Sequence, residues 1–233
     1  MEKMVTLHQT GKQAWIRKAH TLVMAGYAMI SLTLAIVYIR LERPYYYLQS
    51  LGTLFILPLL WGIYRSLRMK PAYRIDIIIV CFTFLAYPIG VVLKANKTVP
   101  LYDKMLHTLS GTLSMMLSYL LFYQLKATHT ADKNDFPLVV VFCLSVTIAV
   151  AGLWEIGEYF LSNLTGIDTQ IVKKTGINDT MQDMIVCSLG SLFFLPFMHD
   201  AYEGKPARFL MIPVKEFLDK YRDGQEIDIK KIA

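Results

Sequence analysis

The sequence predicts an all-α, polytopic integral membrane protein with six transmembrane helices and with both termini in the cytoplasm. Three observations predict this fold class. Hydrophobic residues make up 55% of the 233 residues, and the mean hydropathy is +0.41. These residues form long apolar blocks instead of amphipathic repeats, and most basic residues lie in the short loops and the tail around those blocks.

The net charge of +6 has a topological explanation. Because the basic residues lie between apolar blocks and in the C-terminal tail, membrane topology accounts for them better than nucleic-acid binding does. The three cysteines, Cys81, Cys143 and Cys187, lie inside apolar runs and form no CxxC motif. The sequence therefore predicts neither a disulfide scaffold nor a zinc-thiolate site, and no nucleic-acid partner.

Six apolar runs are predicted to span the membrane, since most exceed the roughly 17 residues needed to cross the hydrocarbon core. They cover residues 20–39, 48–64, 77–93, 103–125, 136–160 and 179–198. Pro58, Pro88 and Pro196 fall within runs and predict kinks, which neighbouring helices tolerate in a membrane. The chain is thus expected to be a multi-pass membrane protein.

The predicted organisation has four parts. Residues 1–19 form a polar cytoplasmic segment, and residues 20–99 hold the first three transmembrane helices. Residues 100–198 hold the last three helices and the polar residues discussed below. Residues 199–233 form a cytoplasmic tail, either an amphipathic helix on the inner membrane surface or a solvated segment. The excess of Lys and Arg on the side of the termini predicts that they are cytoplasmic.

Three short polar stretches stand at the ends of the last three spans. In each stretch two ionisable side chains lie three or four residues apart, which places them on one face of a helix. The pairs are Asp103 with His107, Glu155 with Glu158, and Asp179 with Asp183. Ionisable groups inside a membrane-length segment are costly and by default indicate function, with partners nearby.

The alternation of the spans brings the three pairs to one membrane depth. The start of the fourth span, the end of the fifth and the start of the sixth all lie at the same face of the membrane. Reversing the orientation of the protein moves all three pairs together and changes only the compartment. We therefore expect the pairs to meet.

Five carboxylates near a low-dielectric region need compensation, because two such charges about 4 Å apart repel by about 4 kcal/mol at an effective dielectric near 20. A bound divalent cation, shared protons or local cations such as Lys104, Lys173 and Lys174 could supply it. Since local cations are few, the sequence favours a metal ion, with zinc, manganese or iron suiting mixed imidazole and carboxylate ligands. The predicted ligands are His107, Glu155, Glu158, Asp179 and Asp183.

The predicted chemistry is that of a metal-dependent hydrolase or transferase acting on a membrane lipid or a lipid-linked headgroup at the outer face. Asp103 would serve as general base and Lys104 would bind substrate phosphate. The sequence contains no P-loop, HExxH or GxSxG motif. The prediction therefore depends on the expected geometry alone.

Other interpretations remain open at the level of sequence. The pairs could form a hydrogen-bonded polar network or snorkel to the interface without meeting, as Lys104 alone could do. The protein could be a non-enzymatic binder of a cation or cationic headgroup, a small transporter, or a structural partner in an envelope complex. No such convergence of pairs is expected at the other histidines, His8, His20, His129 and His199, which are therefore expected to be structural.

The loop of residues 162–178 connects the last two spans next to the predicted site. It contains Asp168, Thr169 and Gln170 between two glycines, Gly166 and Gly176. The loop is expected either to fold over the site as a lid or to act only as a connector.

At these stretches the chain resembles the YjdF-like family of uncharacterised bacterial inner-membrane proteins, which is itself similar to the VanZ-like proteins associated with glycopeptide resistance. The resemblance covers residues 100–198. It rests on Asp103-Lys104-x-x-His107 with Ser110-Gly111, on Trp154-Glu155-x-x-Glu158, and on Asp179-Thr180-x-x-Asp183-Met184 with Gly190. It implies a bacterial cell-membrane protein connected with the envelope, and it supplies no biochemical activity that could be carried over to this chain.

Overall fold

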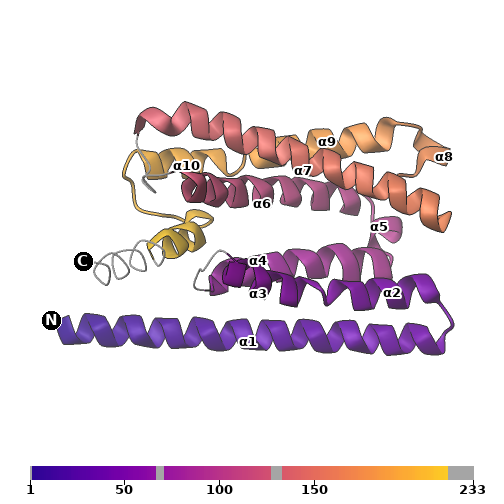
Figure 1. Ribbon diagram of the computed structural model, residues 1–233, viewed down its shortest axis with the longest axis horizontal. Coiled ribbons are helices and arrows are strands. Elements are labelled where there is room, and N and C mark those ends of the chain that lie inside the picture. The colour runs from indigo at the N-terminus through magenta and orange to yellow at the C-terminus, as the bar shows by residue number, and fades with distance from the viewer. Residues whose placement is uncertain (1, 67–70, 127–132, 220–233) are drawn as a thin grey trace. The chain divides into compact units, whose positions relative to one another are not determined.

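The computed structural model describes residues 2–66, 71–126 and 133–219, with side chains from residue 13 onward (Figure 1). The described residues form helices and connections, without a strand. Six helical segments are long and apolar enough to cross a membrane, which confirms the predicted all-α fold with six spans. Met1, part of the linker after the fourth span, and the tail beyond residue 219 lie outside the described residues.

The chain divides into two compact units, residues 1–100 and residues 101–233. The first unit contains α1 (Glu2–Arg40), α2 (Pro44–Thr53), α3 (Ile56–Ser66), α4 (Tyr73–Phe84), a π-helical segment η1 (Leu85–Val92) and the short α5 (Ala95–Thr98). The segment before the first span, which contains no proline, continues the same helix, so α1 begins well before the predicted span.

Each predicted proline kink coincides with a break in a span or with a change of helix type. A proline ring clashes with the carbonyl four residues earlier and removes a helical N–H donor. The second span is accordingly interrupted between α2 and α3, four residues before Pro58. The π-helical η1 begins three residues before Pro88, and the sixth span breaks after Ser191, just before the position four residues ahead of Pro196.

The first unit has a small apolar core and a buried polar contact. Tyr27, Leu60 and Val80 form the core, with partly buried apolar neighbours from α1, α3 and α4. Asp76 in the first turn of α4 is 3% exposed. The Tyr64 hydroxyl donates to its Oδ1 at 2.6 Å, and His20 Nε2 lies 3.1 Å from Oδ2.

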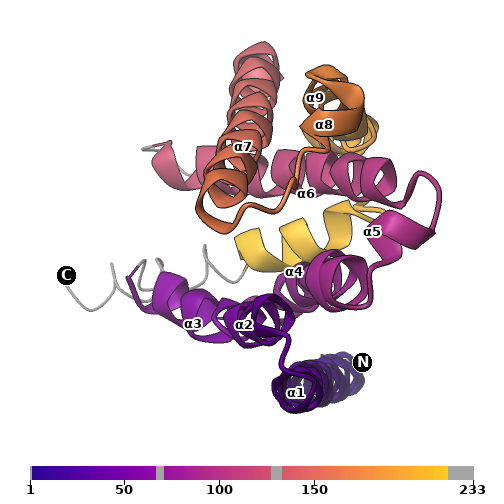
Figure 2. The same cartoon turned by 90° about the vertical axis from the view of Figure 1, so that its right-hand side faces the viewer.

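The second unit consists of three packed spans and a C-terminal helix. The spans are α6 (Tyr102–Leu125), α7 (Phe136–Thr165) preceded by the 3₁₀ turn η2 (Lys133–Asp135), and α9 (Asn178–Ser191) with α10 (Leu195–Tyr202). The short α8 (Val172–Thr175) lies in the loop before α9. Helix α6 packs against both α7 and α9, and α7 also contacts α9 (Figure 1, Figure 2).

Two glycines bring the backbones of α6 and α9 into close contact. A Cβ atom at Gly111 would lie 1.8 Å from the carbonyl oxygen of Cys187, and one at Gly190 would lie 2.0 Å from that of Thr108. The Thr112 hydroxyl adds a hydrogen bond to the Gly190 carbonyl at 2.7 Å. This contact, which only small residues permit, holds the two helices in one register.

In the described part of the predicted tail, residues 199–202 belong to α10 and residues 211–219 form a further helix. Met211, Val214 and Phe217, at helical spacing, are 4%, 0% and 7% exposed. These three side chains are therefore buried within the protein, whereas Phe209, just before the helix, is 73% exposed. The connection before it is held by Asp200, which pairs with both Lys205 and Arg208.

Candidate functional site

Asp103 and His107 occupy the first two turns of α6. Pro100 and Leu101, a residue with a left-handed φ of 60°, end the connection from the third span, and α6 begins at Tyr102. His107 Nε2 lies 3.9 Å from Asp103 Oδ1, as the i, i+4 spacing requires. Both side chains are partly buried.

Lys104 connects α6 to α9. Its ammonium nitrogen lies 2.7 Å from Asp179 Oδ1 and 2.7 Å from Asp183 Oδ1, and 3.7 Å from Asp103 Oδ2. Only 4% of the Asp183 side chain and 13% of the Asp179 side chain are exposed. Lys104 therefore compensates two poorly solvated carboxylates directly, and its ammonium is engaged in the described structure.

Asp103, His107 and Asp183 converge on one point. His107 Nε2 lies 3.6 Å from Asp183 Oδ1, and one ligand atom from each residue lies within 4.8 Å of the others. Donor atoms around a tetrahedral ion with bonds near 2.1 Å stand about 3.4 Å apart. The two separations from His107, 3.6 and 3.9 Å, are larger than this, and all three atoms lie within 4.8 Å of one another, so the side chains would have to move together to hold an ion.

Glu155 lies buried in α7 and is contacted by the loop that follows it. Its side chain is held by Gln170, whose Nε2 lies 3.1 Å from Glu155 Oε2 and 3.1 Å from Thr180 Oγ1. Glu155 is 5% exposed, and its Oε1 has no hydrogen-bond partner in the described part of the chain. The carboxylate interacts electrostatically with His107, so it belongs to the same group of charges.

Glu158 lies one turn further along α7 and is partly buried. The Trp154 indole N–H donates to Glu158 Oε1 at 3.1 Å, and the Thr169 hydroxyl donates to the Glu158 carbonyl at 2.9 Å. The Glu158 carboxylate interacts electrostatically with Asp103 and Asp183. The structure thus brings all three predicted pairs to one end of the second unit.

Within this end of the unit, the contacts between side chains differ from the three pairs that the sequence predicts. Asp103, predicted as a base, stands with His107 and Asp183, whereas Asp179 pairs with Lys104. Glu155 and Glu158 make their hydrogen bonds to Gln170 and Trp154 instead of joining the triad.

Sequence reasoning did not select Gln170 as a site residue, although it placed Gln170 in a possible lid. Its buried amide joins the loop to α7 and α9. Reasoning from sequence also left out Asp76 and treated His20 as isolated, although they contact each other in the first unit. The sequence feature that could have indicated this contact is Asp76 itself, a single acidic residue directly before the third apolar run.

No curated protein and no solved structure matches the chain. A family model described as "Predicted membrane protein (DUF2238)" matches residues 19–201, from the first span to α10. The match bears out the resemblance to a YjdF-like membrane family and extends it to the first three spans, whereas it does not show similarity to VanZ-like proteins. The chain therefore belongs to the DUF2238 family of predicted membrane proteins.

Proposed function

We propose that the protein is a membrane-embedded hydrolase or transferase that uses a divalent metal ion to act on a lipid or lipid-linked headgroup at the outer face of the bacterial cell membrane. The observation that carries the proposal is the convergence of Asp103, His107 and Asp183, with ligand atoms within 4.8 Å of one another. One imidazole and two carboxylates suit zinc, manganese or iron.

The residues around the triad take separate roles in this proposal. A bound ion would supply Lewis acidity toward a phosphoryl or carbonyl oxygen. Asp103 then serves as a ligand, and proton transfer falls to Glu155, whose buried Oε1 has no hydrogen-bond partner among the described residues. Gln170 holds the other oxygen of Glu155 and so orients the base.

Lys104 is assigned a positioning role. Its ammonium lies 2.7 Å from both Asp179 and Asp183, so a substrate phosphate would have to displace a carboxylate to bind it. By holding Asp183, Lys104 orients that carboxylate toward His107. Asp179 serves as its second anchor.

Elemental analysis of the purified full-length protein tests the metal site. About one equivalent of zinc, manganese or iron is expected, and it should be lost in His107→Ala and in Asp183→Asn. His199→Ala is the matched control, because His199 makes an edge-to-face contact with Phe136 at the other end of the unit, with ring centroids 5.3 Å apart. A metal-free protein that takes up none of these ions on dialysis would contradict the proposal.

Turnover separates an enzyme from a binder. Liposomes carrying the metal-loaded protein and a lipid phosphate are expected to release the headgroup or phosphate, and Glu155→Gln should abolish release while retaining the metal. Loss of metal in that variant would instead make Glu155 a ligand.

A second candidate function is binding or passage of a cation without chemistry. It is favoured by one observation: Lys104 already places a cation between two carboxylates, as a polar network without a catalytic role would. A stoichiometric metal without turnover would favour it. Nothing in the geometry singles out the third possibility, a structural partner in an envelope complex.

A further inference from the structure

Glu155 and Glu158 are the carboxylates of the acidic site that form no ion pair among the described residues. Their hydrogen bonds come from neutral donors: the Gln170 amide lies 3.1 Å from Glu155 Oε2, and the Trp154 indole N–H donates to Glu158 Oε1 at 3.1 Å. The other oxygen of Glu155, a residue that is 5% exposed, has no hydrogen-bond partner in the described part of the chain. Because an unpaired buried carboxylate oxygen is costly, this side of the site indicates a ligand.

The positive charges of the site do not compensate these two glutamates. The ammonium of Lys104 lies 2.7 Å from both Asp179 and Asp183. Lys173 and Lys174, on α8, are exposed, and their ammonium groups pair with no carboxylate that the structure describes. A divalent ion in the triad would raise the positive charge of the site to three, against five carboxylates. An anionic headgroup would add to the remaining negative excess, whereas an ammonium group would reduce it.

Trp154 and Glu158 together offer the chemistry that recognises an ammonium group. Trp154 is 43% exposed and Glu158 is partly buried, and the hydrogen bond between them keeps the indole ring beside the carboxylate. A carboxylate accepts strong hydrogen bonds from an ammonium group, and the face of an indole ring attracts a cation. The Glu158 carboxylate also interacts electrostatically with Glu155, Asp103 and Asp183, so the whole site favours a cation at this position.

We propose that Glu158 and Trp154 bind the primary ammonium group of a phospholipid headgroup. This inference rests on the proposed function and names its substrate class, an aminophospholipid. Glu158 accepts hydrogen bonds from the ammonium group, Glu155 stays available as the base, and the headgroup phosphate is presented to the triad. Trp154 and Tyr159, the latter 58% exposed, are residues typical of the membrane–water interface, where headgroups lie.

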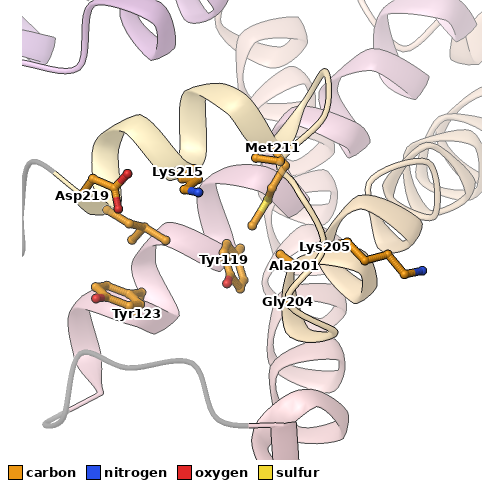
Figure 3. A pocket seen from close by; sticks show the side chains of 10 residues that line it. Tyr119, Tyr123, Ala201, Gly204, Lys205, Met211, Lys215 and Asp219 are labelled. Atoms are coloured by element: carbon orange, nitrogen blue, oxygen red, sulfur yellow. The ribbon is translucent and has the colours of Figure 1, made fainter. Parts of the chain in front are cut away.

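A pocket at the opposite end of the second unit gives the control for this position. It has a volume of about 350 Å³ and lies between the end of α6, the turn after α10 and the helix over residues 211–219 (Figure 3). Its charged lining is mixed, because Lys215 and Asp219 both line it and Lys205 pairs with Asp200 at 2.7 Å. It therefore has no negative excess to attract an ammonium group. Ala207→Phe would fill this pocket without changing its charge.

Native mass spectrometry of the full-length protein in detergent tests the proposal, with phosphatidylethanolamine, phosphatidylcholine and phosphatidylglycerol as probes. Phosphatidylethanolamine should bind most tightly, because a quaternary choline donates no hydrogen bond and phosphatidylglycerol has no cation. Glu158→Gln should weaken its binding about ten-fold, since a hydrogen bond to a charged group is lost, and should not weaken binding of phosphatidylglycerol. Glu158→Asp keeps the charge and should keep the preference.

Two control variants should retain the preference for phosphatidylethanolamine. Glu203→Gln removes the same charge at an exposed carboxylate that pairs with Lys133 at the other end of the unit. Ala207→Phe closes the opposite pocket. Thermal unfolding of every variant shows whether it is folded, and Trp154→Leu, which removes the aromatic face while retaining the Glu158 carboxylate, should also lower the preference.

Competition with free ethanolamine separates the two sources of the ammonium group. Displacement of the lipid by millimolar ethanolamine supports a site that reads the ammonium group alone. Selective binding that ethanolamine does not displace supports a site that also reads the rest of the lipid.

Equal binding of phosphatidylethanolamine and phosphatidylglycerol, or equal effects of Glu158→Gln and Glu203→Gln, would overturn the proposal. So would loss of the preference in Ala207→Phe, or a second equivalent of metal that Glu158→Gln removes. The outcome is separable from that of the proposed function. A preference for phosphatidylethanolamine without metal or turnover would support the ammonium site alone, whereas metal-dependent turnover of both lipids at one rate would support the enzyme and overturn the ammonium site.

Discussion

Lys104 in the first turn of α6 places its ammonium nitrogen 2.7 Å from the carboxylate of Asp183 in α9. Only 4% of the Asp183 side chain is exposed, so this ion pair neutralises a charge that water reaches poorly. The pair therefore links the two helices that carry the triad of Asp103, His107 and Asp183.

Removing the lysine charge should destabilise the protein. Lys104→Met leaves Asp179 and Asp183 without their cation, and breaking a buried ion pair costs on the order of 3 kcal/mol. The free energy of unfolding in detergent is the measurement, and Lys133→Met is the control. The Lys133–Glu203 pair is exposed at 67% and 44% and should contribute at most about 1 kcal/mol.

A double variant checks that the loss comes from the unpaired charge. Adding Asp183→Asn to Lys104→Met should recover part of the stability, because the second change removes the stranded charge. Equal stability of Lys104→Met and Lys133→Met would argue that the ion pair makes no such contribution.

The close contact of α6 with α9 gives a second prediction. Gly111→Ala would put a Cβ 1.8 Å from the Cys187 carbonyl oxygen, so the helices must separate near the site. We expect a loss of about 2 kcal/mol or more from the strain of overpacking, together with lower metal occupancy. Thermal unfolding and metal content measure the two effects.

Gly62→Ala and Gly26→Ala are the controls, since a Cβ at either position meets nothing within 4 Å. Both should be neutral or stabilising by up to about 1 kcal/mol, because alanine favours helix over glycine. If Gly111→Ala behaved like these variants, the close approach would not determine the helix register.

Gln170 gives a third prediction, about the loop that covers Glu155. Gln170→Leu removes the amide that donates to Oε2 of the buried Glu155, whose Oε1 has no hydrogen-bond partner among the described residues, at a cost of about 2 kcal/mol. Gln182→Leu, an exposed amide in α9, is the control. In a Glu155→Leu background the Gln170→Leu change should cost much less, and an unchanged cost there would show that Gln170 acts through other contacts.

A fourth prediction concerns the first unit. Tyr64→Phe removes the hydroxyl that donates to the buried Asp76 carboxylate at 2.6 Å. Hydrogen bonds to charged groups contribute about 2 kcal/mol, so unfolding should begin at a lower temperature. Tyr159→Phe, at a side chain that is 58% exposed, should have little effect, and equal melting of the two variants would contradict the prediction.

The spans and the depth of the acidic pairs could be predicted from sequence because both follow from local patterns. Apolar run length determines whether a helix can cross the bilayer, and alternation of the spans places Asp103, Glu155 and Asp179 at one end. The breaks near Pro58 and Pro196 and the π-helical segment around Pro88 follow equally from the chemistry of one residue.

The pairing inside the site could not be predicted, because it depends on how α6 and α9 are rotated and aligned. Whether Lys104 contacts Asp179 or a lipid is decided by the approach of Gly111 to Cys187, which sequence spacing does not reveal. The contact of His20 with Asp76 joins residues far apart in the chain, and only the packing of α1 against α4 creates it.

The sidedness of the membrane gives the last prediction. The basic loops predict that the start of α7 faces the cytoplasm and that the loop carrying α8 faces outward. Lys133→Cys and Lys173→Cys place single thiols at these two ends, both at exposed positions. A Cys81→Ser background removes the native cysteine that is exposed. A membrane-impermeant maleimide added to intact cells should label residue 173 and spare residue 133 until the membrane is permeabilised. The opposite pattern would place the acidic site at the cytoplasmic face, and its substrate would then be sought among headgroups of the inner leaflet.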